Sequence, residues 1–400
     1  MTATLAGDCH AASPRYSGHM IDAHDRSLFS PEHHAFRDTV RRFLSQAIEP
    51  HLDRHERDGI VERDAWEKAG AAGLLCPQVP EAYGGLGLDF GFNAIVGEEL
   101  SYLGSAAGFT LQSDIVADYL VHYGSEEQKK RYLPGMVAGT TISAIAMTEP
   151  GAGSDLQGLK TIARPGGNGW SLSGSKTYIT NGHSADLVIV AARTTEEGGA
   201  KGLSLFLVEA ADEGFERGRN LDKIGLHGND TAELFFDAVR LPADRLLGGE
   251  NGGFGMLMNQ LPQERLSIAV QCQASAQRAF DEAVKFTADR KAFGKRIIDF
   301  QNTRFTLADL KAKLQVGWAH LDWAIQRHIS GRLTPAEASA AKLWHSEMQW
   351  DACDAALQLH GGAGYMNEYP IARLWRDARV ARIYGGTSEI MKELISRSIQ

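Results

Sequence analysis

The residues best suited to chemistry stand in the stretch 146–155, which reads AMTEPGAGSD. An apolar, strand-like run ends there in Thr-Glu-Pro and opens into a loop with glycines and a Ser-Asp pair. Glycine lets the backbone approach a flat or anionic ligand and turn its N–H groups toward it, and the hydroxyls of Thr148 and Ser154 can form hydrogen bonds. The stretch predicts a ligand-binding loop, although a plain junction between a strand and a turn would look the same.

Three further segments combine polar, aromatic and glycine residues. Residues 174–182 (GSKTYITNG) end in an Asn-Gly pair, a turn signal that also fits a plain hairpin. Residues 290–301 hold a basic cluster and a glycine stop, which also fit an ordinary helix end. Residues 358–365 (QLHGGAGY) fit a helix end as well. None of these segments is a G-x-G-x-x-G fingerprint, so a nicotinamide enzyme is not indicated.

These four segments together resemble the FAD-contacting segments of the acyl-CoA dehydrogenases. The resemblance covers nearly everything after about residue 28 and is strongest to the long-chain branch of that family. The phrases that carry it are AMTEPGAGSDLQG, DTAELFFDAVRLP, LPQERL and IYGGTSEIMKEL.

The resemblance implies FAD as the cofactor. It implies that Tyr178 stacks on the flavin, although tryptophan or phenylalanine is commoner at this position in the family. It also implies that Arg290 pairs with the pyrophosphate of FAD, because a guanidinium suits the geometry of phosphate. Residues 358–362 are expected to meet the adenosine half of an FAD held by a neighbouring subunit, which implies a homo-oligomer, usually a tetramer built as a dimer of dimers. The residues expected to contact FAD are Met147, Thr148, Gly153, Ser154, Tyr178, Ile179, Thr180, Arg290, Phe293, Gln301, Gln358, Leu359, His360, Gly361, Gly362, Thr387, Ser388 and Glu389.

The implied reaction is the α,β-dehydrogenation of a saturated acyl-CoA to the trans-2-enoyl-CoA, in which a base removes the α proton and a hydride leaves the β carbon for flavin N5. Because an α C–H beside a thioester is a weak acid, the site needs a positioned carboxylate and donors for the enolate oxygen. Most relatives supply the carboxylate from a late Tyr-Glu-Gly-Thr turn, whereas this chain reads YGGT at 384–387. The base must therefore come from elsewhere.

The segment LPQERL at 261–266 offers that carboxylate. Long-chain and branched-chain relatives place the catalytic glutamate on this helix, just before an arginine, which points to Glu264. Pro262 is expected to begin or bend the helix, so that nearby backbone donors favour a carboxylate. A glutamate near a helix start, paired with solvent or lysine, is the plainer interpretation, and the glycine at 385 weighs against it. The backbone N–H of Gly385 is expected to bind the thioester carbonyl together with a ribityl hydroxyl.

Expectations for the substrate are weaker. Ala107, Leu111 and Gly255 stand where an acyl tail should pass, which suits a medium or long chain but equally suits core packing. An electron-transferring flavoprotein is the expected electron acceptor. The residues expected to contact the substrate are Ser154, Ala200, Lys201, Gly255, Pro262, Gln263, Arg265, Gly385 and Gly386.

Other functions are compatible with the same resemblance. An oxygen-using relative, such as an acyl-CoA oxidase, nitroalkane oxidase or monooxygenase, would share the same segments, although oxidases of this family are often longer. A dehydrogenase for acyl chains tethered to a carrier protein would share them too. A non-catalytic thioester-binding or scaffold protein is disfavoured by the intact flavin segments and Glu264.

Composition sets the broad class. The 400 residues carry a formal net charge of -9, with 43% hydrophobic and 23% charged residues, which argues against nucleic-acid binding and a polybasic anchor. No apolar run approaches a membrane span. The four cysteines lie far apart without metal or disulfide spacing, and the first residues lack a secretory or transit pattern, so we expect a cytoplasmic protein with no metal.

Hydrophobic periodicity predicts an α+β architecture in three domains. Helical spacing dominates 29–139, short alternating segments with glycine-rich turns fill 140–250, and long helical runs occupy 251–400. We expect an N-terminal helical domain, a middle antiparallel β-barrel and a C-terminal four-helix bundle, as in the acyl-CoA dehydrogenases. Residues 1–28 are expected to form a flexible tail.

Overall fold

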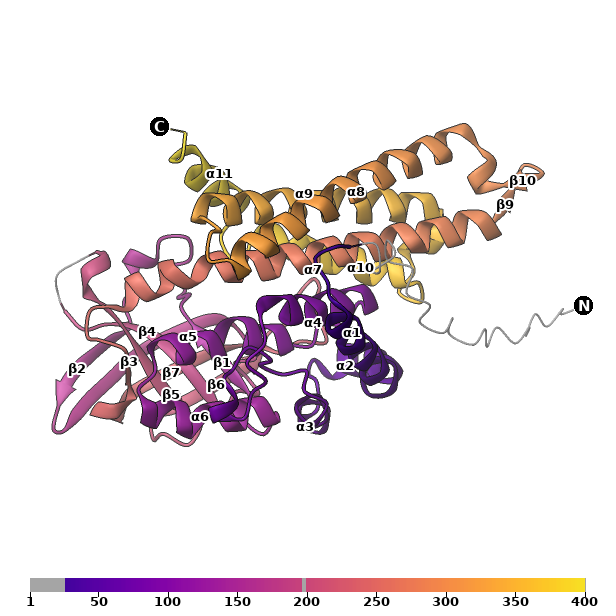
Figure 1. The fold of residues 1–400 in the computed structure, drawn as a ribbon. Coiled ribbons are helices and arrows are strands. Elements are labelled where there is room, and N and C mark those ends of the chain that lie inside the picture. Colours follow the sequence, from indigo (N-terminus) through magenta and orange to yellow (C-terminus); the bar gives the residue numbers. More distant parts are fainter. Residues whose placement is uncertain (1–25, 196–198, 400) are drawn as a thin grey trace, which may run out of the picture.

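The computed structural model describes residues 26–195 and 199–399. The first helices lie beside a β-sheet, and long C-terminal helices extend across both (Figure 1). The predicted succession of helices, sheet and helices is therefore confirmed.

The N-terminal helices are short and pack their apolar faces together. Capping fixes several of their ends: Ser125 accepts a hydrogen bond from the backbone of Gln128 at the start of one helix, and Gly104 ends another in the left-handed conformation that glycine tolerates. These elements are α1 (Pro31–Phe43), η2 (Leu44–Ile48), η3 (Glu49–His51), α2 (Leu52–Asp58), α3 (Arg63–Ala71), η4 (Glu81–Tyr83), α4 (Phe90–Leu103), η5 (Leu111–Val116), α5 (Ala117–Tyr123) and α6 (Glu126–Ala138).

Helix α4 is buried along almost its whole length and carries two fully buried carboxylates, Glu98 and Glu99. Arg26 and Arg37 bind Glu98 at 2.8 and 2.7 Å, and Arg37 also binds Glu99 at 2.6 Å. Burial opposes ionisation of Glu98, but these arginines outweigh it and hold the pKa of Glu98 below its ordinary value. The arginines therefore make a charged helix compatible with a buried position.

The sheet is mainly antiparallel, as expected, but it also contains parallel pairs that the sequence did not predict. Its hydrogen-bonded order is β6-β7-β3-β2-β4-β5-β8. Strand β1 pairs with β4 in parallel, and so does the first residue of β2. Within the described residues no hydrogen-bonded pair joins β6 to β8. The strands are β1 (Ser143–Ala146), β2 (Ile162–Gly166), β3 (Gly169–Thr180), β4 (Leu187–Arg193), β5 (Leu203–Glu209), β6 (Phe215–Asn220), β7 (Thr231–Pro242) and β8 (Leu246–Leu247).

Strand β4 explains the mixed pairing, because it is buried on both faces, as parallel-paired strands usually are. Its side chains alternate between two cores. Leu187 and Ile189 pack with the N-terminal helices, whereas Val188 and Val190 pack inside the sheet. The sheet is thereby fixed to the helices that precede it.

The C-terminal part is built on α7 (Gly253–Asp289), a helix of 37 residues that packs against α4, α8 and α9. Pro262 lies inside this helix rather than at its start, so of the two expectations the helix start is excluded and the bend stays a prediction. Proline leaves the carbonyl one turn earlier without its helical partner, and packing on several sides compensates. The remaining elements are β9 (Lys291–Ala292), β10 (Lys295–Arg296), η9 (Ile297–Asp299), α8 (Gln301–Ile329), α9 (Pro335–His360), η10 (Gly361–Tyr365), α10 (Pro370–Ala378), η11 (Arg379–Arg382) and α11 (Ser388–Ser396).

The predicted flexible tail, residues 1–28, lies largely outside the described residues, and its boundary stays a prediction. Residues 1–25 lie outside the described residues, but Arg26 is buried and bonds both Glu98 and Asp322. Arg26 therefore joins the N-terminal helices to α8. Of the helices in the described ranges, none has the length and apolar character needed to cross a bilayer.

Replacing Arg37 with methionine should destabilise the protein strongly. The change leaves Glu98 and Glu99 buried with one cation fewer, which costs about 3–5 kcal/mol of unfolding free energy for a buried pair. Urea unfolding followed by tryptophan fluorescence measures this. The control is Arg57→Met, which removes an exposed pair with Asp58 and should leave the midpoint nearly unchanged. Equal midpoints for both variants would contradict the assigned role of Arg37.

Candidate active site

A buried ion pair ties the two predicted flavin loops together. Lys176 of β3 donates to the carboxylate of Glu149 at 2.8 Å and to the carbonyl of Met147 at 3.0 Å. The backbone N–H of Thr177 also donates to the carbonyl of Thr148 at 2.9 Å. Burial lowers the pKa of Lys176 to about 8, and Glu149 opposes that shift, so the lysine stays largely charged at neutral pH. The loop after β1 and the end of β3 therefore form one unit.

Tyr178 stands at the end of this unit in an unusual conformation. Its φ is +60°, in the left-handed region, and its side chain is 71% exposed. A bulky residue rarely adopts this conformation, and such strain concentrates at functional sites. Its neighbour Ile179 is buried, and Thr180 is half-buried. The strand end thus presents an aromatic ring and a hydroxyl at the surface.

Glu264 lies on α7 and is almost completely buried. The hydroxyl of Tyr119 donates to its Oε1 at 3.0 Å. Burial raises the pKa of Glu264 to about 7, although Tyr119 and Arg265 oppose the shift. A carboxyl group that titrates near neutral pH suits a general base. The expected donors of a helix N-terminus do not reach it, because α7 begins at Gly253.

The turn at Gly385 and Gly386 lies against the same face of α7. A Cβ on Gly385 would lie 2.3 Å from Cδ1 of Ile268, one helical turn beyond Glu264, and a Cβ on Gly386 would lie 3.9 Å from Nη2 of Arg265. Both glycines have positive φ, and the Gly386 carbonyl accepts from Lys342 at 2.6 Å. Ile268 occupies the space that a side chain at 385 would need, so the predicted thioester donor meets α7 one helical turn from the predicted base.

A second group of predicted FAD residues lies at the other end of α7. The turn of the β9–β10 hairpin carries Phe293, and Arg290 and Gln301 lie before and after the hairpin in the chain. Close to the end of α7, the ring of His360 stacks on Phe286 with centroids 4.3 Å apart. Figure 1 shows α7 running from the sheet to this hairpin. The rise of an α-helix separates Glu264 from Arg290 by roughly 40 Å. One chain therefore does not bring the two groups together.

Of the other residues predicted to contact FAD or substrate, some are exposed and others hold neighbouring elements in place. Ser154, Gly153 and Lys201 are exposed, and so are Gln358, Gly361 and Gly362, while the side chain of Ala200 lies outside the described residues. Thr387 caps α11 by accepting from the backbone of Ile390, Ser388 donates to Glu347, and Glu389 is exposed. Ala107 is buried, Leu111 is half-buried, and Gly255 is exposed in the first turn of α7.

These groups fit FAD. The exposed Tyr178 ring and the nearby hydroxyls suit a flat polar ring system, and a Cβ on Gly153 would meet nothing within 4 Å, so the loop leaves open space. Phe293 is 95% exposed beside the exposed Arg290, a combination that suits an adenine or pyrophosphate. Among the described residues no cluster of potential ligands could hold a metal ion.

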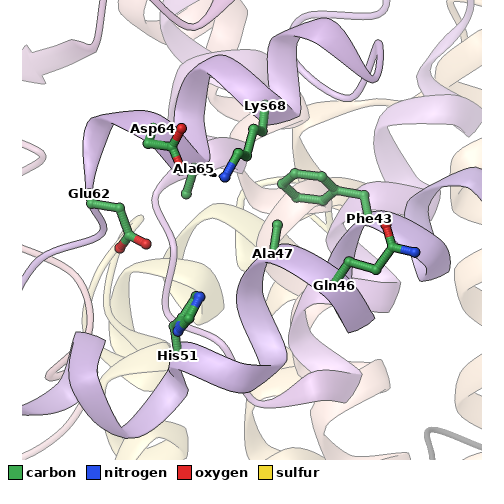
Figure 2. Close-up of a pocket in the computed structure, with 8 residues that line it drawn as sticks. All are labelled: Phe43, Gln46, Ala47, His51, Glu62, Asp64, Ala65 and Lys68. Atoms are coloured by element: carbon green, nitrogen blue, oxygen red, sulfur yellow. Dashed lines mark hydrogen bonds and ion pairs between the residues drawn. The ribbon is translucent and has the colours of Figure 1, made fainter.

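A hollow of about 320 Å³ lies apart from these groups, on α1, η2 and α3. Figure 2 shows the side chains around it, which include Phe43, His51 and Lys68. Lys68 already pairs with Asp64, and Glu62 pairs with Arg54 and His55. The hollow contains none of the residues predicted for catalysis or FAD binding, so we do not treat it as the active site.

Sequence reasoning missed several supporting residues. Lys176 and Glu149 stand inside the segments quoted above. A lysine in the middle of an expected strand was a usable signal for Lys176. Lys342 and Tyr119 gave none, because their partners lie 44 and 145 residues away along the chain.

Models of one protein family match nearly the whole described chain. The acyl-CoA dehydrogenase N-terminal domain matches residues 30–140, its middle domain matches 144–239, and its C-terminal domain matches 251–400.

Individual relatives agree. The long-chain specific acyl-CoA dehydrogenase, mitochondrial, of Sus scrofa is 51% identical over 383 residues, which cover 95% of this chain and 89% of that protein. The crystal structure of an acyl-CoA dehydrogenase from Geobacillus kaustophilus superposes with a TM-score of 0.92 at 45% identity, covering 94% of this chain and all of that one. A glutaryl-CoA dehydrogenase from Mycobacterium smegmatis, in complex with FADH2, gives 0.87 at 28% identity, covering 93% and 95% of the two chains. The chain therefore belongs to the acyl-CoA dehydrogenase family, whose members are FAD-dependent oxidoreductases.

Proposed function

We propose that this protein catalyses the FAD-dependent α,β-dehydrogenation of a medium- or long-chain acyl-CoA, with Glu264 as the base. The observation that carries the proposal is the contact between α7 and the 385–386 turn. In support of it, Glu264 has a buried carboxyl group of pKa about 7, and Ile268, one helical turn along α7, meets the turn expected to bind the thioester. The preference for long chains rests on the name of the pig relative.

The chain's own residues would divide the work as follows. The carboxylate of Glu264 takes the α proton, and the backbone N–H of Gly385 holds the thioester carbonyl as negative charge develops on its oxygen. Lys342 anchors the 385–386 turn through the Gly386 carbonyl. When bound, FAD accepts the hydrogen that leaves the β carbon with its electron pair. Tyr178, Thr180 and the loop at 147–154 would hold the flavin end.

The arrangement along α7 supports a shared FAD site. Because Arg290, Phe293 and residues 358–362 lie at the far end of α7, they can meet the flavin end only by binding an FAD held by another copy. The assembly in this proposal is a homo-oligomer, namely a tetramer built as a dimer of dimers. An electron-transferring flavoprotein is the proposed electron acceptor.

We propose that the protein works in a reducing cellular compartment. The described cysteines, Cys76, Cys272 and Cys353, are buried and free. The sequence-based expectation of the cytoplasm stays a prediction, and the pig relative is named as mitochondrial.

The test is an anaerobic titration of the FAD-loaded protein with saturated acyl-CoAs of graded length, followed by flavin absorbance. Bleaching that is deepest with long chains supports the proposal. Rapid reaction of the reduced flavin with oxygen would favour an oxidase or monooxygenase. Bleaching only with carrier-bound acyl chains would favour the carrier-tethered alternative. FAD that no chain bleaches would indicate a binding protein.

Glu264→Gln should keep FAD but lower the rate of flavin bleaching by about a thousandfold, because the amide cannot accept the α proton. Stopped-flow absorbance measures the rate. The matched control is Glu216→Gln, which changes an exposed glutamate on β6 and should leave the rate unchanged. Normal bleaching in Glu264→Gln would remove Glu264 as the base.

The bleaching rate should depend on pH through Glu264. Burial raises its pKa to about 7, and only the ionised carboxylate can take a proton. The kcat/KM value for bleaching should therefore fall as the pH drops below about 7 and should level off above it. A limb at the ordinary pKa of an exposed glutamate would contradict the predicted environment.

Lys176→Met should weaken FAD binding by at least about tenfold, because Glu149 and the carbonyl of Met147 lose the partner that holds the loop. Fluorescence titration of the apoprotein with FAD measures the dissociation constant. Lys160→Met is the control, since that side chain is exposed in the same region. Equal affinities in the two variants would exclude this role for Lys176.

A further inference from the structure

Three side-chain hydrogen bonds join α7 to the helical segment of η5 and α5 within little more than one turn of α7. Gln263 Nε2 donates to the carbonyl of Asp114 at 2.6 Å, the Tyr119 hydroxyl donates to Glu264 Oε1 at 3.0 Å, and the Ser267 hydroxyl donates to the Asp114 carboxyl group. Glu264 lies between the other two bonds. The contact thus fixes both the backbone around Glu264 and one of its carboxyl oxygens.

We propose that Tyr119 is a positioning residue for Glu264, which holds Oε1 by a hydrogen bond and leaves Oε2 to take the substrate's α proton. The proposal rests on Glu264 being the base. No other residue in the described ranges offers a hydrogen bond to either oxygen of this carboxyl group. The orientation of the base therefore depends on one phenol.

The environment of Tyr119 makes this bond persistent. Tyr119 is fully buried, and burial together with the adjacent Glu264 raises its pKa far above the ordinary value, so the phenol stays a donor. A neutral donor to a buried carboxylate favours the ionised form and offsets part of the cost of burying that charge. The bond thereby both aims the carboxylate and keeps it ionised at lower pH.

Other charges near Glu264 act in both directions. Arg265 favours the ionised form of Glu264, and Asp118 disfavours it. His122 pairs with Asp118, which raises the pKa of His122 to about 9. Titratable and charged groups also lie on each element around Glu264. They are Arg265 on α7; Asp114, Asp118, Tyr119, His122 and Tyr123 on η5 and α5; and His328 on α8. All except Tyr119 are unchanged by the substitution below.

The test is the pH profile of anaerobic flavin bleaching in FAD-loaded Tyr119→Phe. Loss of the bond should move the acid limb upward by about one pH unit and lower the plateau rate, because the carboxylate is less ionised and less well aimed. Tyr123→Phe is the matched control: it makes the same change one helical turn away, on a ring whose centroid is 6.2 Å from that of Tyr119. Its limb should stay in place.

A second variant covers a folding defect in Tyr119→Phe. Incorporation of 3-fluorotyrosine at position 119 keeps the shape of the ring and makes the phenol a stronger donor, so the acid limb should move to lower pH. The Glu264 carboxyl group can also be titrated directly, from infrared difference spectra between the wild-type protein and Glu264→Gln. Limbs that stay in place in both Tyr119 variants would overturn the role of Tyr119.

The outcomes separate this inference from the proposed function. If Glu264→Gln still bleaches normally, the base assignment fails and the inference fails with it. If Glu264→Gln is inactive and the Tyr119 variants leave the limb unmoved, Glu264 stays the base and only the role of Tyr119 is lost. A lower plateau without a moved limb indicates a merely structural tyrosine and also overturns the inference.

Discussion

The burial of carboxylates between packed helices is the constraint on which this structure depends, because a buried carboxylate needs a partner that stabilises its charge. Isolated carboxylates do not ionise readily in such a place. The fold meets this requirement differently for each one: arginines neutralise Glu98 and Glu99, whereas Glu264 has a phenol and only the field of Arg265. The arginines thereby hold the pKa of Glu98 below its ordinary value, whereas burial raises the pKa of Glu264 to about 7, close to neutral pH. The partners of each buried carboxylate thus distinguish the structural Glu98 and Glu99 from Glu264, the proposed base.

The two loops predicted to bind the flavin depend on a similar pairing of charges. Glu149 is buried under the loop that carries Thr148 and Ser154, and Lys176 supplies its counter-charge from the neighbouring strand. A register shift in the β3–β7 pairing between Lys176 and Ile179 accompanies the left-handed conformation of Tyr178. The bulge allows Lys176 to point inward while Tyr178 stays outside. A rigid interior and an exposed, strained ring are therefore two results of one local distortion.

Much of this architecture could be predicted from the sequence, and the failures have physical causes. Helical and strand periodicities gave the order of the three parts, whose boundaries at 139/140 and 250/251 stay predictions, and a glycine at 385 directed attention to Glu264. The parallel pairing of β1 with β4 was not predicted, because β4 reads as a short apolar run, which does not reveal the direction of its neighbours. Pro262 suggested a helix start, but tertiary packing carries α7 through it. Tyr119 and Lys342 act through contacts between distant segments, which local patterns do not encode. The FAD-contacting residues stay predictions as a set.

The length of α7 has a consequence for how the protein behaves at low abundance. If each FAD is held by the flavin end of one chain and the hairpin end of another, cofactor binding and assembly are linked by mass action. Dilution then loosens FAD and the subunit contact together, and free FAD in turn promotes association. Under the same arrangement, a chain damaged at Phe293 and a chain damaged at Glu264 would form one intact site between them, because each supplies the half that the other lacks.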